Sequence, residues 1–221
     1  MISSWKDTKN GIVNILGSGP SLFHVDIKLL EKHDCIYVNS SALILPEKFN
    51  GFKIWLSLDR LCIKWSYFWR NVISSSCLKL VENDYKKYEE HLSKYNVMYF
   101  EASKNEIEDD KLCGVSSVPA AIDLALKMGY QKILLFGIDH RFVQGKSHFW
   151  EYYPSSQKPK FIGGINISKK EQQEKFDENI SYFKKLKEIA DNKNVEIINC
   201  AKRTSALDVF PKIPINDGLK M

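Results

Sequence analysis

Short apolar runs alternate along this chain with longer segments in which apolar residues recur every three or four positions. The first pattern predicts buried strands, and the second predicts helices that cover them. Because the two alternate, we expect an α/β fold: a three-layer Rossmann-like domain with a mostly parallel sheet and helices on both faces. The predicted strands are residues 11–16, 35–39, 52–59, 97–100, 132–139 and 195–199, and the predicted helices are residues 22–33, 60–72, 84–95, 119–128, 169–192 and 205–210.

The length of the chain favours one domain over two. A chain of 221 residues, 44% of them hydrophobic, is long enough for one substantial core and short for two. We therefore expect a single domain over residues 1–221. Residues 140–167 show no sustained period and predict a long lid-like loop, and loops of this length inside a compact domain usually carry function.

The first predicted strand leads into the turn Gly17-Ser18-Gly19-Pro20-Ser21. Glycine lets a ligand approach the backbone, proline suits the first turn of a helix, and either serine can cap that helix. The N–H groups at a helix start attract phosphate, so this turn is a candidate phosphate site. The alternative is a plain strand-to-helix turn in which the glycines serve geometry alone.

Polar residues follow several of the predicted strands. In a parallel sheet these strand ends meet at one edge, where α/β proteins bind their ligands. The chemistry that fits is nucleotide binding, with phosphates at residues 17–21, a base or ribose at Asn39, and a second helix N-terminus at Ser116 and Ser117. Asp59 and Asp139 could hold Mg²⁺ between them, because Mg²⁺ prefers one or two carboxylates plus phosphate oxygens. For Asp139 the alternative is a helix or loop cap. The strand-end residues are Asn39, Asp59, Asp139 and Asn199.

Two further features have both a functional and a structural interpretation. His148, in the long loop, is a candidate catalytic acid or base because the pKa of histidine lies near neutral pH, or it is a loop residue without a role. The aromatic residues of segment 60–72 follow a helical period, which favours a core stripe over a platform for stacking bases. Lys202 and Arg203, after the last strand, could meet phosphate charge.

Composition narrows the range of partners. Lys and Arg number 32 and Asp and Glu 27, so the net charge is +5, and because it is spread along the chain we expect no nucleic-acid partner. A mildly basic surface suits an anionic nucleotide. No apolar run approaches the roughly 20 residues of a membrane span, which predicts a cytoplasmic protein without one. The cysteines have no metal-binding or disulfide spacing and are expected to be reduced; they are Cys35, Cys62, Cys77, Cys113 and Cys200.

Several stretches of the sequence resemble one known family. Residues 17–22, Gly-Ser-Gly-Pro-Ser-Leu, resemble its opening G-x-G-P-S-L, and residues 116–139 resemble its second signature. Asn199 and the ending from Ser205 to Pro211 also match. On these residues the chain, from about Gly11 to Pro211, resembles the archaeal 6-hydroxymethylpterin diphosphokinases (MptE-like). That family is similar to bacterial CMP-sialic-acid-dependent sialyltransferases and to the Maf proteins that modify flagellin.

The resemblance implies a nucleotide site that includes Gly137 and attack by a substrate hydroxyl on an activated donor. In a diphosphokinase the donor is ATP with Mg²⁺, and the acceptor is a pterin-like or other small alcohol under the aromatic residues 148–153. In a sialyltransferase-like enzyme the donor is a CMP-linked or other nucleotide sugar, without a metal, and the acceptor is a surface glycan. A nucleotide-binding module without catalysis is a third hypothesis, and the oligomeric state, homo-oligomer included, stays open.

One departure concerns the catalytic base. The sialyltransferases carry a histidine just before the long helix that follows their lid, whereas residues 161–166 here read Phe-Ile-Gly-Gly-Ile-Asn. His148 lies well upstream of that place, so the resemblance does not assign it the role.

Overall fold

The computed structural model describes residues 2–46, 49–103, 107–114, 116–161 and 169–221. Within them, seven strands form one sheet in the order β5-β4-β3-β2-β1-β8-β9, and every neighbouring pair is parallel. The short strands β6 (Ala102–Ser103) and β7 (Leu112–Cys113) pair separately. The strands of the main sheet are β1 (Ile12–Leu16), β2 (Asp34–Val38), β3 (Lys53–Ser57), β4 (Leu78–Glu82), β5 (Val97–Phe100), β8 (Lys132–Phe136) and β9 (Glu196–Asn199).

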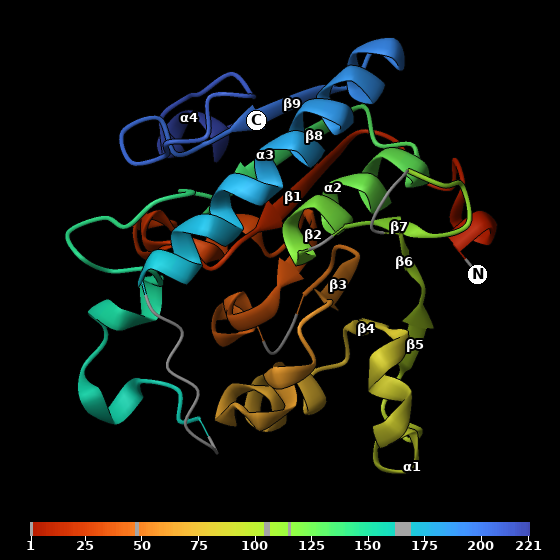
Figure 1. The fold of residues 1–221 in the computed structure, drawn as a ribbon, viewed down its shortest axis with the longest axis vertical. Coiled ribbons are helices and arrows are strands. Elements are labelled where there is room, and N and C mark those ends of the chain that lie inside the picture. Colours follow the sequence, from red (N-terminus) through yellow and green to blue (C-terminus); the bar gives the residue numbers. More distant parts are fainter. Residues whose placement is uncertain (1, 47–48, 104–106, 115, 162–168) are drawn as a thin grey trace.

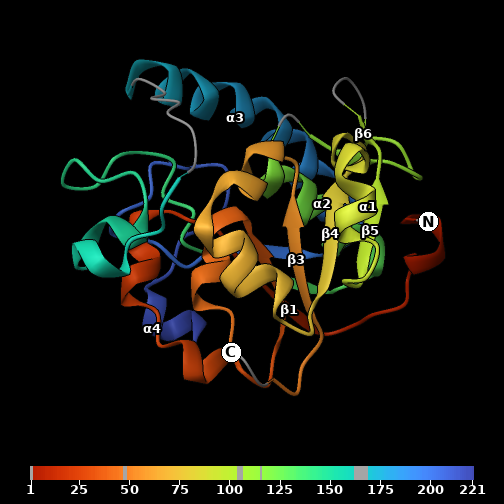
Figure 2. The same cartoon turned by 90° about the horizontal axis from the view of Figure 1, so that it is seen from below.

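The helices differ in kind on the two faces of the sheet. One face is covered by α2 (Ser117–Met128) and α3 (Lys169–Asn192), which lie against each other (Figure 1). The other is covered mainly by 3₁₀ turns and by α4 (Ile215–Gly218), which lies across the sheet from α3 (Figure 2). A π-helical turn spans Phe68–Ile73, and α1 (Glu89–Leu92) follows Tyr88. Along the whole described chain, the 3₁₀ segments are Ile2–Trp5, Pro20–His24, Ile27–Leu30, Asn39–Ile44, Arg60–Lys64, Asn83–Tyr88, Phe149–Tyr152 and Ser155–Gln157.

Buried strands with two apolar faces separate two hydrophobic clusters. On β1, Val13 and Ile15 face α2 and α3, while Leu16 belongs to the cluster on the opposite face. The helix α2 is buried along most of its length and ends at Gly129, whose φ of +93° suits a residue without a Cβ. Burial on both faces is the reason that the strands read as continuous apolar runs.

The predicted α/β class, with a three-layer Rossmann-like arrangement and a mostly parallel sheet, is confirmed. The strand β4 escaped prediction because Lys79 interrupts its apolar pattern; the Lys79 side chain is buried and its ammonium donates to the Ser75 carbonyl at 2.5 Å. The helices predicted at 22–33 and 60–72 are wrong in type, since 3₁₀ or π turns occupy most of each. The helix predicted at 84–95 is confirmed only for α1, which a 3₁₀ turn precedes.

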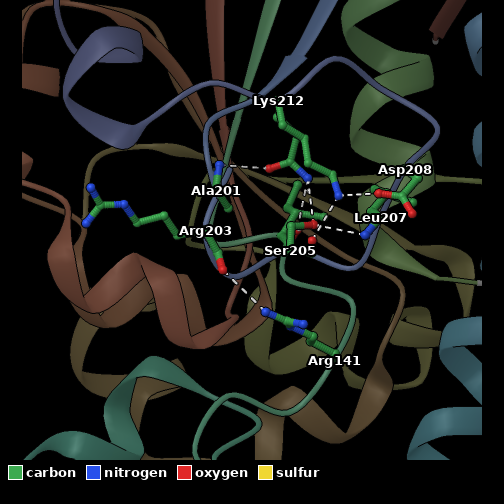
Figure 3. Close-up of polar contacts among 9 residues, drawn as sticks. Arg141, Ala201, Arg203, Ser205, Leu207, Asp208 and Lys212 are labelled. Carbon is green, nitrogen blue, oxygen red and sulfur yellow. Dashed lines mark hydrogen bonds and ion pairs between the residues drawn. The ribbon is translucent and has the colours of Figure 1, made fainter.

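The predicted helix at 205–210 is also wrong, since that segment is irregular and the last helix is α4. Ser205 explains the difference. Its hydroxyl accepts from the Leu207 N–H at 3.1 Å (Figure 3). The same hydroxyl donates to the Ile138 carbonyl at 2.9 Å, so the segment is tied to the chain just after β8. None of the helices in the described ranges is both long enough and apolar enough to cross a bilayer.

The strand order places a ligand site beside β1. From β1 the chain moves outward through β2 to β5, then returns to form β8 on the other side of β1. The connections on the two sides of β1 therefore diverge, and a crevice opens outside the carboxyl ends of the strands at such a switch point.

Candidate functional site

A cavity of about 300 Å³ lies at the switch point, outside the carboxyl ends of β1, β2 and β8. It gathers most of the residues that the sequence singled out, although they are far apart along the chain. A second cavity of about 200 Å³ adjoins it and shares Ser18, Asn39, Asp59 and His148. The predicted residues lining the first cavity are Ser18, Gly19, Pro20, Asn39, Asp59, Ser116, Ser117, Gly137, Asp139 and His148.

Other predicted residues lie beside this cavity without lining it. Gly17 is packed beneath the turn, and Asn199 is buried with its amide bonded to the Ile138 carbonyl. Ser21 lines a separate cavity of about 360 Å³, together with Lys202 and Arg203. The predicted contact of these two cations with a phosphate in the main cavity therefore has no geometric support.

The glycine turn is bound tightly to β8. The N–H groups of Gly17 and Gly19 donate to the carbonyls of Phe136 and Gly137 at 2.8 and 2.7 Å, and the Ser21 N–H donates to Asp139 at 2.8 Å. Pro20 has no N–H to offer. These three N–H groups are therefore already paired, and the predicted phosphate site at this turn stays a prediction that rests on the Ser18 N–H. The glycines serve close packing: a Cβ on Gly17 would lie 2.5 Å from the Gly137 carbonyl oxygen.

Asp139 ties two segments together at the back of the cavity. Its carboxylate is 1% exposed; Oδ2 accepts from the Ser21 N–H and Oδ1 accepts a short bond from the Thr204 hydroxyl. The alternative of a loop cap, weighed from the sequence, describes this geometry. A role in catalysis or in metal binding stays a prediction.

Asn39 joins three elements in a left-handed conformation. Its φ is +51°, which asparagine tolerates better than most residues. Its Oδ1 accepts from the hydroxyls of Ser57 at 2.9 Å and Ser117 at 3.0 Å, so it connects the ends of β2 and β3 to the start of α2. The Asn39 amide nitrogen has no hydrogen-bond partner among the described residues, which leaves it as a donor at the cavity wall.

The N-terminus of α2 supplies the remaining donors. Ser116, Ser117 and Val118 line the cavity at the start of this twelve-residue helix. Free N–H groups and the positive end of the helix dipole favour an anion there. The Ser116 hydroxyl is held by Asn179 of α3 at 2.8 Å. This helix start is better placed for phosphate than the glycine turn.

His148 is oriented by a carboxylate that the sequence analysis missed. The Ser147 hydroxyl donates to Glu151 Oε1 at 2.7 Å and lies 2.8 Å from His148 Nδ1. Because that hydroxyl has only one proton, Nδ1–H must donate to Ser147, and in the neutral tautomer that this bond selects, the lone pair is on His148 Nε2. The available signal was the pair of His148 and a glutamate three residues later, typical of a helix start: Glu151 accepts the His148 N–H at 2.8 Å.

Glu151 remains charged over a wide range of pH. Partial burial acts to raise the pKa of Glu151, but hydrogen bonds from His148, Ser147 and their backbone N–H groups outweigh it and lower that pKa to about 2. Phe149 fixes the segment, since it is fully buried and its N–H donates to the Ser18 carbonyl at 3.1 Å. His148 thus sits on a segment attached to the glycine turn.

Two neighbours of Asp139 also face the cavity. Burial lowers the pKa of His140 from 6.5 to about 4, although the nearby charge of Asp177 acts to raise it, so the ring is neutral at pH 7. The buried Nε2 of His140 has no hydrogen-bond partner in the described parts of the chain. Arg141 brings a cation to the wall. Its guanidinium donates to the Arg203 carbonyl at 3.3 Å, while the Arg203 side chain points away (Figure 3).

Asp59 is exposed at the junction of the two cavities. Its Oδ1 accepts from the Leu61 N–H at 2.9 Å and caps the 3₁₀ turn Arg60–Lys64. The predicted Mg²⁺ site at Asp59 and Asp139 stays a prediction. Among the residues that the structure describes, no group of three or more His, Cys, Asp or Glu is placed to hold a metal ion.

The parallel sheet, with a cavity at its switch point, defines a Rossmann-like α/β fold, and comparison with solved structures places that fold more closely. The fold is similar to that of the monofunctional α-2,3-sialyltransferase Cst-I from Campylobacter jejuni, with a TM-score of 0.54 and 17% identity over 91% of this chain and 79% of that one. It is also similar to the sialyltransferase CstII from Campylobacter jejuni in complex with cytidine-5′-monophosphate, with a TM-score of 0.47 and 13% identity over 92% of this chain and 85% of that one.

The comparisons are informative at the level of fold. No protein-family model matches the sequence, and no curated protein matches it. The relation to sialyltransferases that the sequence suggested is confirmed for the fold. The diphosphokinase family finds no support in these comparisons and stays a prediction from the sequence motifs.

Proposed function

We propose that this protein is a glycosyltransferase that uses a CMP-linked sugar as its donor. The observation that supports this most is one cavity, at the switch point of a sialyltransferase-like fold, that combines the Asn39 amide, the start of α2, Arg141 and an oriented histidine. This proposal takes the second hypothesis drawn from the sequence in place of pyrophosphoryl transfer, because the fold likeness favours it and the comparisons give the first no support.

Four groups around the cavity bind the donor nucleotide in this proposal. The N-terminus of α2 and Arg141 bind the donor phosphate, since both present positive charge to the cavity. The Asn39 amide nitrogen donates to the ribose or base. The turn residues Ser18, Gly19 and Pro20 line the cavity and provide the wall against which the nucleotide packs.

His148 is the proposed general base. An acceptor hydroxyl forms a bond to the anomeric carbon of the donor sugar, the bond from that carbon to phosphate oxygen breaks, and CMP leaves. The hydroxyl proton passes to His148 Nε2, and the negative charge of Glu151, relayed through Ser147, stabilises the resulting imidazolium. Ser147 and Glu151 are positioning residues in this scheme.

Two measurements test the proposal. CMP should raise the melting temperature of the protein without Mg²⁺, because a ligand that binds only the folded state stabilises it. With a CMP-linked sialic acid as donor, the protein should release CMP, and His148→Gln should lower that rate at least 100-fold.

The same two measurements distinguish the proposed function from a diphosphokinase and from a binding module without catalysis. Stabilisation by ATP that depends on Mg²⁺, with no effect of CMP, would overturn the proposal in favour of a diphosphokinase. CMP binding without any release of CMP from the donor would indicate a module without catalysis.

A further inference from the structure

The second cavity has walls of a different chemistry from the first. Four aromatic residues line it: Trp65, Tyr67, Trp150 and Phe161. The centroid of the Trp65 ring lies 4.8 Å from that of Phe161 and 5.7 Å from that of Trp150. Aromatic rings this close usually belong to a core, but Trp65, Trp150 and Phe161 are only half-buried. Part of their surface is open to a ligand.

The rings are held in place by polar contacts. The Trp150 indole N–H donates to the Ser40 hydroxyl at 3.1 Å, and its ring stacks on His148 at 5.1 Å. Residues 65 and 66 pair with 160 and 161 through an isolated bridge and through the Ser66 N–H, which donates to the Lys160 carbonyl at 2.8 Å. The aromatic wall is therefore formed before any ligand arrives.

The rim of this cavity is polar and carries negative charge. Asn39 and Ser18 reach it from the donor side, and Asp59 contributes a carboxylate. Among the described residues that line it there is no Lys or Arg. A flat apolar wall with hydrogen-bonding groups at its edge fits a pyranose ring, whose C–H face is apolar and whose hydroxyls lie around its edge. The carboxylate disfavours an anionic ring in the same place.

The position and size of the cavity suit an acceptor. It holds about 200 Å³, less than the 300–1,000 Å³ typical of sites for drug-sized ligands, so it has room for one ring. His148 lines both cavities, which places a ring stacked on Trp150 beside the proposed base.

We infer that Trp65, Tyr67, Trp150 and Phe161 form the acceptor subsite and that it takes an uncharged pyranose. This inference rests on the proposed glycosyltransferase function. A nucleobase would stack on the same rings, and the test below separates the two occupants.

A binding measurement tests the inference and does not require the protein to catalyse a reaction. Tryptophan emission is followed while the wild-type protein is titrated with methyl β-galactoside, methyl β-glucoside and methyl β-N-acetylglucosaminide. Methyl galacturonide is titrated in the same way as the anionic counterpart of the galactoside. At least one neutral sugar should give a saturable change, and galacturonide should bind at least tenfold more weakly than the galactoside. The inference is overturned if no neutral sugar binds, or if galacturonide binds as well as the galactoside.

Substitutions locate the binding. Trp150→Leu and Trp65→Leu should weaken sugar binding at least tenfold, whereas Trp150→Phe, which keeps a ring, should restore most of it. The matched control is Trp69→Leu: Trp69 is 43% exposed, donates from its indole to the Ile63 carbonyl, and lines neither cavity, so sugar binding should not change. A Trp150→Leu variant that loses affinity for CMP but not for sugar would place the base there and overturn the inference.

The two proposals fail in different ways. If neutral sugars bind but CMP neither binds nor is released from the donor, the glycosyltransferase function fails while the sugar subsite stands. If CMP is bound and released but no neutral sugar binds, the function stands and the acceptor subsite fails.

Discussion

Substitution of Asp139 tests whether this carboxylate holds the site together. Asp139 accepts one hydrogen bond from the Ser21 N–H and one from the Thr204 hydroxyl, and it is 1% exposed. Hydrogen bonds to a charged group contribute about 1.5–3 kcal/mol each, and those between neutral groups about 0.5–1.5 kcal/mol. Asp139→Asn keeps an acceptor for Ser21, so it should lower the free energy of unfolding by roughly 2 kcal/mol. Asp139→Ala leaves both donors without a partner and should cost roughly 4 kcal/mol.

Urea unfolding measures these differences in the free energy of unfolding. An unchanged m-value shows that each variant exposes the same surface on unfolding as the wild-type protein. Thr204→Val should cost about 1–2 kcal/mol in the wild-type protein and almost nothing in Asp139→Ala, because the partner is already gone. Asp139→Ala unfolding within 0.5 kcal/mol of wild type, or fully additive costs in the double variant, would refute this account of Asp139. A rise of the wild-type midpoint with Mg²⁺, lost in Asp59→Asn, would instead support the predicted metal site.

Three further predictions follow from the geometry. A Cβ on Gly19 would lie 2.7 Å from the Gly137 carbonyl oxygen and closer still to Asp139, so Gly19→Ala should lower the free energy of unfolding in urea by about 2–4 kcal/mol. The control is Gly145→Ala, where a Cβ would meet no atom within 4 Å; it should cost roughly 1 kcal/mol for its φ of +74°. Arg141→Gln should weaken CMP binding about 10–100-fold by calorimetry, while Lys202→Gln in the separate cavity should not; equal effects would contradict the assignment of Arg141. Because the folded-state pKa of His140 is lowered from 6.5 to about 4, the unfolded chain binds more protons between these values, so stability should fall as pH drops from about 6.5 to 4. Partial solvent access should hold that loss to roughly 2 kcal/mol, and His140→Asn should flatten the slope.

The sequence predicted best where a pattern is local and strong. The helix predicted at 169–192 matches α3 residue for residue, because its apolar residues keep one period from Phe176 to Ile189, about four turns. The meeting of Ser18, Asn39 and Asp139 at one cavity followed from the rule that parallel strands end at a common edge. Neither result required knowledge of side-chain contacts.

Tertiary pairing explains what the sequence could not supply. The N–H groups of Gly17 and Gly19 look free in a strand-to-helix turn, and only the adjacency of β1 and β8 reveals that carbonyls of β8 accept them. The role of Glu151 depends on a 3₁₀ turn that no periodic pattern marks. The segment after Asn199 resembled a helix, but bonds to the end of β8 override that propensity.

The bond from the Phe149 N–H to the Ser18 carbonyl has a consequence for the order of events in a catalytic cycle. It joins the residue next to His148, the proposed base, directly to the glycine turn that lines the proposed donor cavity. In the proposed reaction, His148 would therefore already lie at the donor cavity, and binding of the acceptor would be the last step before transfer.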